Sequence, residues 1–293
     1  MQYCELMFSK NASNGQYDGR IKSRLSFRDE RLYYKIDDMT FDMKLADRVI
    51  RIHAMHDYIK EYCRDYVLSK QQENSEESPV DFEVTVTQSD IDFERGKSAA
   101  EDRKEGIPIR HFADDYLETL AVYRKIAEQM LSYDTILFHG SVIAVDGEGY
   151  LFTAKSGTGK STHTRLWRET FGHRAVMVND DKPLLRITKE GVTAYGTPWD
   201  GKHRLSTNTS VPLKGICILE RAAENHIIRL DTKEQMRSAY PMIVQQTHKS
   251  SNPANALKTM ELIDRLMEAV PIYRLSCNME RSAAKVAYEG MQG

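Results

Sequence analysis

Residues 154–161 have the sequence Ala-Lys-Ser-Gly-Thr-Gly-Lys-Ser, and they lie between a short apolar segment and a segment with helical periodicity, Ser161 to Phe171. Glycines at 157 and 159 allow successive backbone N–H groups to turn inward around the oxygens of a phosphate group. The helix that follows would direct its unpaired N–H groups and the positive end of its dipole at the same anion. The stretch therefore predicts a phosphate-binding loop between a strand and a helix.

The residues of this loop have expected roles. Lys160 would place its charge between the β- and γ-phosphates of a nucleotide, and the Ser161 hydroxyl would bind Mg²⁺. Ala154 stands where such loops usually have their first glycine, and an alanine fits there if its φ is negative. We expect the nucleotide to contact seven residues: Ser156, Gly157, Thr158, Gly159, Lys160, Ser161 and Thr162.

Two carboxylates follow a second apolar segment. Residues 176–181 are Val-Met-Val-Asn-Asp-Asp, which predicts a buried strand that ends at Asp180 and Asp181. Ligands of open α/β sheets lie at the carboxyl ends of the strands, so both acids are expected to face the phosphate-binding loop. One acid can hold Mg²⁺ together with Ser161, and the other can accept the proton of an attacking hydroxyl group. An Asp-Asp turn that only closes the strand is the alternative.

Alternating and helical patterns around these motifs predict the remaining elements. Strands are expected at residues 31–37, 81–87, 136–145, 150–153, 175–178, 191–195, 215–219 and 271–277. Helices are expected at residues 57–68, 114–133 and 283–288, and another should begin at Asn252 and Pro253. Residues 70–79 are polar and acidic and predict an exposed loop. On the helix after the phosphate-binding loop, Arg165 and Arg168 are expected at the surface rather than in a catalytic site.

Composition excludes several classes of protein. The chain has 293 residues with 41 Lys and Arg against 43 Asp and Glu, and this near balance argues against a general nucleic-acid or membrane-surface binder. The mean hydropathy is −0.55, and no apolar run approaches the ~20 residues of a membrane helix. The first residues show no signal-peptide pattern. The four cysteines are far apart, so we expect reduced thiols in a cytoplasmic protein, with a disulfide or zinc site as the lesser alternative.

The length favours two domains, or one domain with a large addition. The residue pattern of the sequence changes near residue 110. We therefore expect an N-terminal α+β domain of unknown role at residues 1–110 and a nucleotide-binding domain at residues 111–293.

The segment from Phe138 to Leu185 resembles the catalytic core of HPr kinase/phosphorylase and, more distantly, of phosphoenolpyruvate carboxykinase. That core contains a His-Gly pair, a β-hairpin, a loop ending Ser-Gly-x-Gly-Lys-Ser, a helix, and a strand ending Asp-Asp. Here the pair is His139-Gly140, and the other motifs follow in the same order and spacing. The resemblance implies that Asp180 accepts the proton of the acceptor hydroxyl. It also implies that Asp181 and His139 are its neighbours, with His139 hydrogen-bonded to a carboxylate or to the phosphate.

The chain departs from that family at three places. Thr162 follows the serine of the loop where the kinase has an acidic residue, and Thr193 lies near the position of a later acidic metal-site residue. The signature linked to dephosphorylation and carrier-protein recognition is absent, and Gly196 to Arg204 stands in its place. This segment resembles HPr-kinase-like proteins thought to phosphorylate small peptides.

The segment Gly196 to Arg204 allows two interpretations. In one, it binds substrate or nucleotide, with Trp199 as a platform, Asp200 as a metal ligand or hydroxyl acceptor, and Lys202 and Arg204 as anion contacts. In the other, a buried Trp199 anchors a loop with a solvated basic tip.

We expect an α/β fold with a P-loop core like that of phosphoenolpyruvate carboxykinase and a smaller N-terminal α+β domain. The expected activity is transfer of the γ-phosphate of ATP, with Mg²⁺, to a hydroxyl of a small molecule, peptide or seryl residue. The alternatives are a nucleotide-binding regulator without turnover and a carboxykinase-like lyase. No nucleic-acid or membrane partner is expected, and the acceptor, the preferred nucleotide and homo-oligomer formation are left open.

Overall fold

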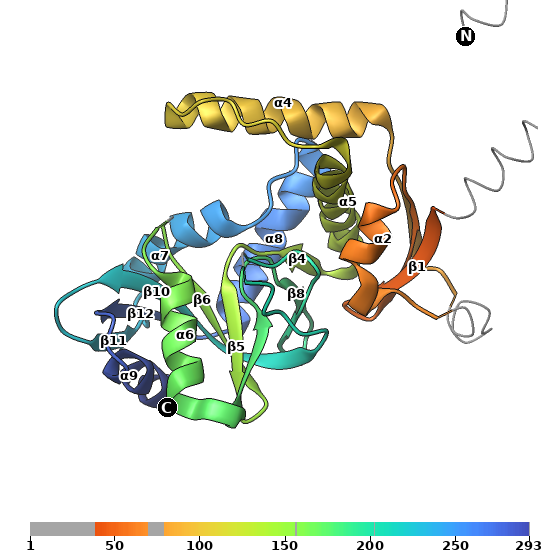
Figure 1. Ribbon diagram of the computed structural model, residues 1–293. Coiled ribbons are helices and arrows are strands. Elements are labelled where there is room, and N and C mark those ends of the chain that lie inside the picture. Colours follow the sequence, from red (N-terminus) through yellow and green to blue (C-terminus); the bar gives the residue numbers. More distant parts are fainter. Residues whose placement is uncertain (1–38, 70–78, 156, 202, 293) are drawn as a thin grey trace, which may run out of the picture. The chain divides into compact units, whose positions relative to one another are not determined.

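A computed structural model describes residues 39–69, 79–155, 157–201 and 203–292 (Figure 1). The chain divides into two units, Met1–Met39 and Thr40–Gly293, and the described helices and strands belong to the second. The strand predicted at residues 31–37 lies outside the described residues, as does the loop predicted at 70–79 except for its last residue. Ser156 and Lys202 also lie outside them.

A small three-stranded sheet begins the second unit. β1 (Thr40–Leu45) pairs antiparallel with β2 (Arg48–His53), and β2 pairs in parallel with β3 (Phe82–Thr85). The single helix predicted at residues 57–68 is instead a short helix α2 (Tyr58–Tyr62) and a 3₁₀ turn η2 (Arg64–Tyr66). The α-helix ends at Cys63, where ψ is 8° and the α-helical hydrogen-bond pattern stops.

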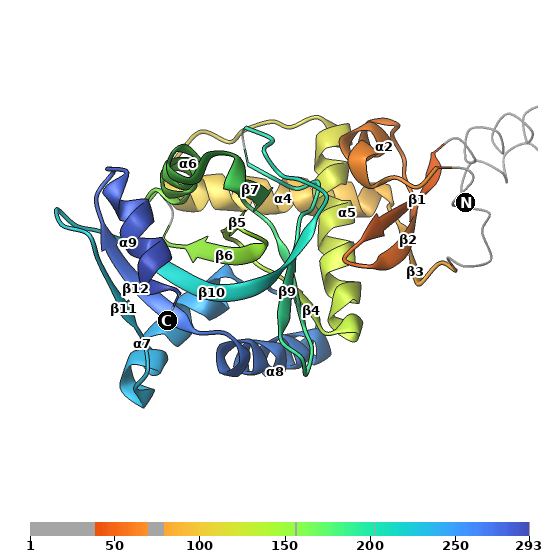
Figure 2. The same ribbon diagram turned by 90° about the horizontal axis from the view of Figure 1, so that it is seen from below.

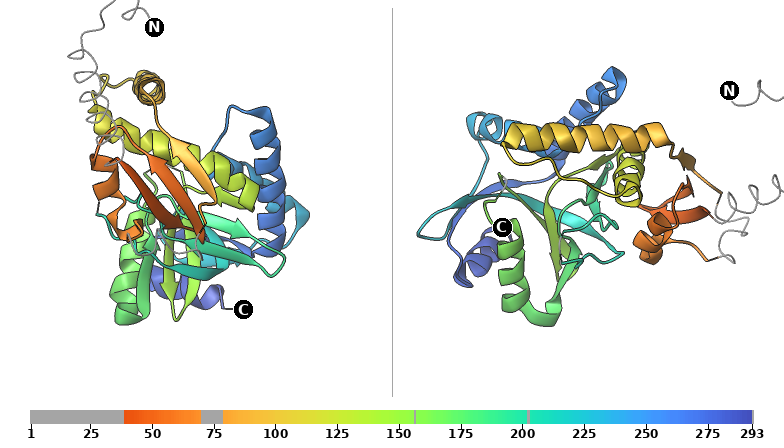
Figure 3. Two further views of the ribbon diagram at one scale, coloured as in Figure 1. Left: turned by 90° about the vertical axis from the view of Figure 1, so that its right-hand side faces the viewer. Right: turned by 45° about the horizontal axis from the view of Figure 1, so that its top comes forward.

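Two helices pack beside this sheet. α4 (Gln88–Glu105) ends at Gly106, which has a left-handed φ of 71°, and α5 (Asp114–Met130) continues into the 3₁₀ turn η3 (Leu131–Tyr133). Figure 3 shows α4 beside α5. Arg124 of α5 pairs with Glu94 and Asp90 of α4, which links the two helices. The prediction of a helix at residues 114–133 is confirmed.

A nine-stranded mixed sheet forms the larger part of the unit. Seven strands follow one another in the order β4-β8-β9-β10-β6-β5-β7, and β12 pairs with β10 and β11. Their bounds are β4 (Thr135–Leu137), β5 (Ser141–Val145), β6 (Glu148–Thr153), β7 (Ala175–Asn179), β8 (Leu184–Ile187), β9 (Val192–Tyr195), β10 (Ser210–Arg221), β11 (His226–Arg229) and β12 (Ile272–Cys277). Strands β8 and β11 lack the sequence signals that predicted the others.

The single strand predicted at residues 136–145 is wrong. Residues 138–140 interrupt it, so β4 pairs with β8 at one end of the sheet and β5 pairs with β6 and β7 at the other. At the interruption the His139 N–H donates to the Gln246 carbonyl at 2.7 Å, and the Gly140 N–H donates to the Asp181 carbonyl at 3.0 Å. The chain thus changes partners at His139 and Gly140, which separate two apolar stretches that were predicted as one strand.

The strand directions determine where the sheet presents its loops. β10 runs parallel to both β6 and β12, and β5 runs antiparallel to both β6 and β7. β6, β7 and β10 therefore point the same way, so the loop after β6 and the acids after β7 emerge at the same edge of the sheet. Figure 2 shows β10 as a long curved strand between β9 and β6, and its first residues, Ser210 to Pro212, pair with β9.

Helices cover both faces of this sheet. Alternate residues of a strand point to opposite faces, so Val142 and Ala144 join one buried cluster while Ile143 and Val145 join another. The first cluster contains residues of α7 (Lys233–Gln246) and α8 (Pro253–Ala269), and the second contains residues of α6 (Lys160–Phe171) and α9 (Ser282–Gly290). The predicted start at Asn252 is confirmed, because its side chain accepts the Ala254 N–H at 3.0 Å.

The architecture is mixed α/β. One buried cluster joins residues of β1 and α2 to residues of α5, β4 and β8, so it contains side chains from both sides of position 110. The domain boundary near residue 110 stays a prediction. Within the described residues, no helix has the length and apolar character that a membrane crossing requires. Cys63 and Cys217 are buried free thiols and Cys277 is a half-buried one; Cys4 lies outside the described residues.

Candidate active site

The loop between β6 and α6 has the backbone geometry that its glycines predict. Gly157 and Gly159 have φ values of 75° and 122°, which L side chains rarely adopt, and α6 begins directly after Gly159. Ala154 is buried and is not among the residues with positive φ, so it meets the condition under which alanine fits there. The first N–H groups of a helix have no partner within it, so the start of α6 offers free donors at this loop.

Arg221, the last residue of β10, supports this loop from the neighbouring strand. Its guanidinium group donates to the carbonyl oxygens of Gly157 and, at 3.3 Å, Thr158. No sequence pattern indicated this contact, because it depends on the parallel pairing of β10 with β6. The end of β10 and the loop also line a pocket of about 510 Å³, which contains Lys155, Gly157, Thr158, Ile218, Leu219, Glu220, Arg221 and Met242.

Asn179 fixes the backbone that carries the two acids. Its buried side-chain oxygen accepts the N–H groups of Asp181 at 2.9 Å and Lys182 at 2.5 Å. Its amide nitrogen donates to the carbonyl and the hydroxyl of Thr197, at 3.2 and 3.1 Å. An Asn before a turn can accept hydrogen bonds from the backbone N–H groups that follow it. The residue type at position 179 is therefore a signal from which this contact could have been predicted.

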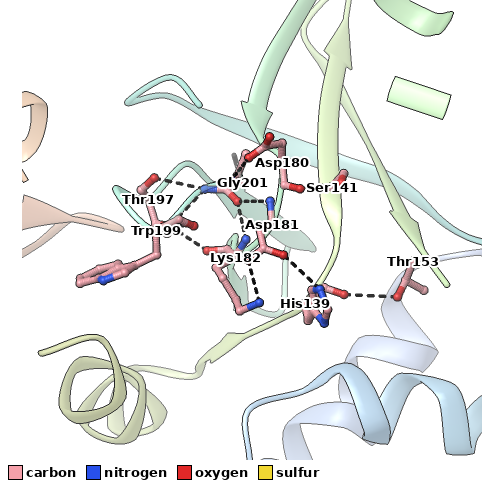
Figure 4. A network of polar contacts seen from close by, with 10 residues as sticks. His139, Ser141, Thr153, Asp180, Asp181, Lys182, Thr197, Trp199 and Gly201 are labelled. Atoms are coloured by element: carbon pink, nitrogen blue, oxygen red, sulfur yellow. Dashed lines mark hydrogen bonds and ion pairs between the residues drawn. The ribbon is translucent and has the colours of Figure 1, made fainter. Parts of the chain in front are cut away.

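Asp181 is held by His139 and Lys182. Its carboxylate lies 3.0 Å from Nε2 of His139 and 2.8 Å from Nζ of Lys182 (Figure 4). Burial would raise the pKa of Asp181, but the hydrogen bond from His139 and the charge of Lys182 outweigh it and hold the pKa below the usual range. Asp181 therefore remains an anion. The pKa of Lys160 lies below its usual value. Burial lowers it most and the charge of Lys182 lowers it further, while the charge of Asp181 acts in the opposite sense.

Asp180 lies in a different environment although it is the adjacent residue. Its side chain accepts the N–H of Gly201, and Ser141 Oγ donates to its backbone carbonyl at 2.8 Å. Burial and the neighbouring charge of Asp181 raise its pKa, although the Gly201 N–H acts in the opposite sense. Two adjacent carboxyl groups with opposite pKa shifts are typical of a site that divides acid–base roles. The more basic group is Asp180.

A second pocket brings Asp180 beside the first turns of α6. Its volume is about 470 Å³, and it is lined by Ser161, Thr162, Thr164, Arg165, Arg168, Asp180, His203 and Leu205. Ser161, Thr162 and Asp180 are thus together, as predicted. Arg165 is exposed, as expected, and Arg168 is half-buried; both also line this pocket, together with His203 and Leu205.

A nucleotide-bound Mg²⁺ would fit this arrangement. Across the described part of the chain, no group of three or more His, Cys, Asp or Glu side chains is placed to hold a metal ion. Mg²⁺ in nucleotide sites needs fewer protein ligands, because phosphate oxygens and water complete its octahedral shell. The Ser161 hydroxyl and the Asp180 carboxylate line one pocket and supply such ligands. Asp181 is a poorer ligand, because His139 and Lys182 already occupy its oxygens.

Trp199 follows the second interpretation of its segment. The indole is only 5% exposed, packs on Tyr123, and donates its N–H to the Thr119 carbonyl of α5 at 3.0 Å. Figure 4 shows the ring directed away from the two acids. Trp199 is therefore an anchor of the loop. Asp200 remains near the site, because the charge of Asp180 contributes to raising its pKa.

A family model described as "SynChlorMet cassette protein ScmC" matches residues 109–283, more than half of the chain. No curated protein matches the sequence. Among solved structures, the Hpr(Ser) kinase/phosphatase from Coxiella burnetii is weakly similar, with a TM-score of 0.29 and 11% identity over 54% of this chain and 99% of that chain.

Proposed function

The chain belongs to the ScmC family of SynChlorMet cassette proteins, and we propose that it is an ATP-dependent phosphotransferase. In this proposal its mixed sheet and the β6–α6 loop form a kinase-type P-loop core. The γ-phosphate moves from ATP to a hydroxyl group of a small molecule, a peptide or a seryl residue. The observation that carries the proposal is one pocket that joins Ser161, at the start of α6, to the buried carboxylate of Asp180.

The side chains divide the work of such a transfer. The backbone of the loop and the ammonium of Lys160 bind the phosphates of ATP and stabilise the charge of the transferring group. The oxygen of the acceptor hydroxyl bonds to the γ-phosphorus while the bond between that phosphorus and the ADP oxygen breaks. Asp180 accepts the proton that this hydroxyl loses. Burial raises the pKa of Asp180, which makes it a better base. Mg²⁺, when bound by Ser161 and the phosphate oxygens, would supply charge neutralisation of the phosphates.

Asp181 and His139 position this machinery. The Asp181 carboxylate, paired with His139 and Lys182, gives a fixed negative charge that acts on the Lys160 ammonium. The fixed charge of Asp181 keeps Lys160 in place before the nucleotide binds. Binding then requires less reorganisation of the site.

Two variants separate the roles of binding and transfer. Lys160→Ala should weaken binding of ATP about tenfold or more, because a charged contact to the phosphates is lost. Asp180→Asn should bind ATP within about twofold of the wild type but transfer about 10²–10⁴-fold more slowly, because the proton acceptor is gone. Calorimetry measures the binding, and single-turnover transfer of labelled phosphate to a pool of metabolites and peptides measures the reaction.

Lys189→Ala, in the exposed turn between β8 and β9, is the matched control and should leave both measurements unchanged. Full single-turnover transfer by Asp180→Asn would contradict the role given to Asp180. A wild-type protein that binds ATP, yet labels no acceptor and forms no ADP, would contradict the proposal and favour a nucleotide-binding regulator.

A further inference from the structure

The pocket beside Asp180 has an excess of basic side chains on its walls. Arg165 and Arg168 come from α6, and His203 comes from the segment after Gly201. Arg165 and Arg168 follow Ser161 at intervals of four and seven residues, so all three lie on the same face of the helix. At a rise of 1.5 Å per residue, Arg168 lies about 10 Å along the axis from Ser161. The basic wall therefore extends away from the phosphate-binding loop.

The two arginines differ in their partners. Arg165 is paired with Glu169 at 2.5 Å, and Glu169 also pairs with Arg281 at 3.3 Å. For Arg168, by contrast, the described residues provide no hydrogen bond or ion pair to its guanidinium group, and its Nε atom is buried without a partner. An unpaired charge beside a pocket is costly unless something binds it. Arg168 is thus a charge without a counterion at the edge of the proposed acceptor site.

Resting on the proposed function, we propose that the phosphate acceptor carries an anionic group, a carboxylate or a phosphate, in addition to its reacting hydroxyl. Arg168 binds this group from α6, and His203 contacts it from the facing wall. The guanidinium group suits both anions, because its parallel N–H donors match two oxygens at once. A pocket of about 470 Å³ is of the size that small-molecule ligands occupy.

The nucleotide does not account for this basic wall. In the proposed function, the loop backbone and Lys160 bind its phosphates, at the opposite end of the same helix face. An acceptor placed with its hydroxyl at Asp180 and its anionic group at Arg168 would occupy the pocket without displacing the donor. A neutral alcohol of the same size would offer no partner to the half-buried guanidinium group of Arg168, so it would bind more weakly.

The site can be tested without knowledge of the acceptor. Inorganic phosphate is titrated into the full-length protein saturated with Mg²⁺ and a non-hydrolysable ATP analogue, so that the loop is filled, and binding is followed by NMR of arginine and histidine side chains. We expect phosphate to bind the loaded wild type and to bind Arg168→Gln about tenfold more weakly. His203→Gln, an exposed position, should weaken binding about threefold, and Arg168→Lys should retain part of it.

Arg174→Gln is the control, because Arg174 is an exposed arginine paired with Asp146 outside this pocket, and it should bind phosphate as the wild type does. Equal affinity in wild type and Arg168→Gln, or no binding to the loaded wild type, would overturn the inference. An equally large loss of ATP affinity in Arg168→Gln would also overturn it, since Arg168 would then belong to the donor site.

The acceptor itself gives the second arm of the test. For the acceptor found with labelled ATP, Arg168→Gln should raise KM about tenfold while kcat changes less than about threefold. An acceptor without a carboxylate or phosphate would overturn the inference and leave the phosphotransferase proposal standing. Absence of any transfer contradicts the phosphotransferase proposal, and the phosphate titration still decides the anion site.

Discussion

Gly201 is the position at which a single methyl group should separate nucleotide binding from transfer. Its backbone N–H donates to the Asp180 carboxylate, and a Cβ atom at this residue would lie 2.6 Å from Oδ2 and 3.0 Å from Cγ and Oδ1 of Asp180. Ordinary contact of a Cβ atom begins at 3.4 Å. Gly201→Ala therefore requires the carboxyl group of Asp180 to move by about 0.8 Å or to turn away from the N–H.

The magnitude follows from the displacement. A misplacement of about 1 Å of a reacting group can cost about 10²-fold in rate, so we expect single-turnover transfer by Gly201→Ala to fall about 30- to 100-fold. Overpacking of this kind also costs about 1–3 kcal/mol of stability. The affinity for ATP should stay within about twofold, because the phosphate-binding loop and Lys160 are not in contact with the added methyl group.

The assay combines calorimetric binding of ATP, urea unfolding and transfer of labelled phosphate. Gly96→Ala is the matched control, because a Cβ atom at Gly96, in the helix α4, meets nothing within 4 Å. That variant should transfer at the wild-type rate and gain about 1 kcal/mol of stability from the better helix former. Wild-type transfer by Gly201→Ala would refute the reasoning, because the position of the Asp180 carboxylate would then not limit the reaction.

Two further predictions concern stability. Trp199→Phe should lose about 1–3 kcal/mol in urea unfolding, because the indole N–H bond to Thr119 and part of a buried ring are removed, and should keep its ATP affinity; lost substrate binding at unchanged stability would return Trp199 to the role of a platform. Burial raises the pKa of Asp180 above its usual 3.8, so the folded protein holds that proton more tightly than the unfolded chain, and this contribution to stability declines as pH rises through the raised pKa. Asp180→Asn should therefore raise the Tm at pH 7 and leave it nearly unchanged at pH 3; equal shifts at both pH values would contradict this cause.

Much of the local structure could be predicted because the signals lie within short segments. The apolar alternation of β6, the glycines of the loop and the helical spacing of α6 are adjacent in the chain, and each is decided by rules that act over a few residues. Residues 136–145 show the limit of such rules. Their two apolar stretches are separated only by His139, Gly140 and Ser141, yet contacts to Gln246 and Asp181 divide the segment into two strands with different partners.

Within the site, the sequence predicted the functional side chains but not the residues that hold them in place. Lys160, Ser161 and the two acids were found from motifs, whereas Lys182 and Arg221 show their roles only through their distances to Asp181 and to the loop carbonyls. Whether Trp199 is exposed or buried depends on α5, which is remote in the sequence. A side chain's type sets what it can do, and its neighbours in space decide whether it does so.

The sequence by itself determined a glycine-rich loop, the helix after it and a strand ending in two acids, because these follow from local geometry. Only the tertiary structure decided that β6, β7 and β10 run parallel, so that loop, acids and Arg221 meet at one edge of the sheet. It also decided that the adjacent Asp180 and Asp181 have opposite pKa shifts. The contact of Asp180 with Gly201 and the pairing of Asp181 with His139 join residues far apart in the sequence, and no local pattern encodes them.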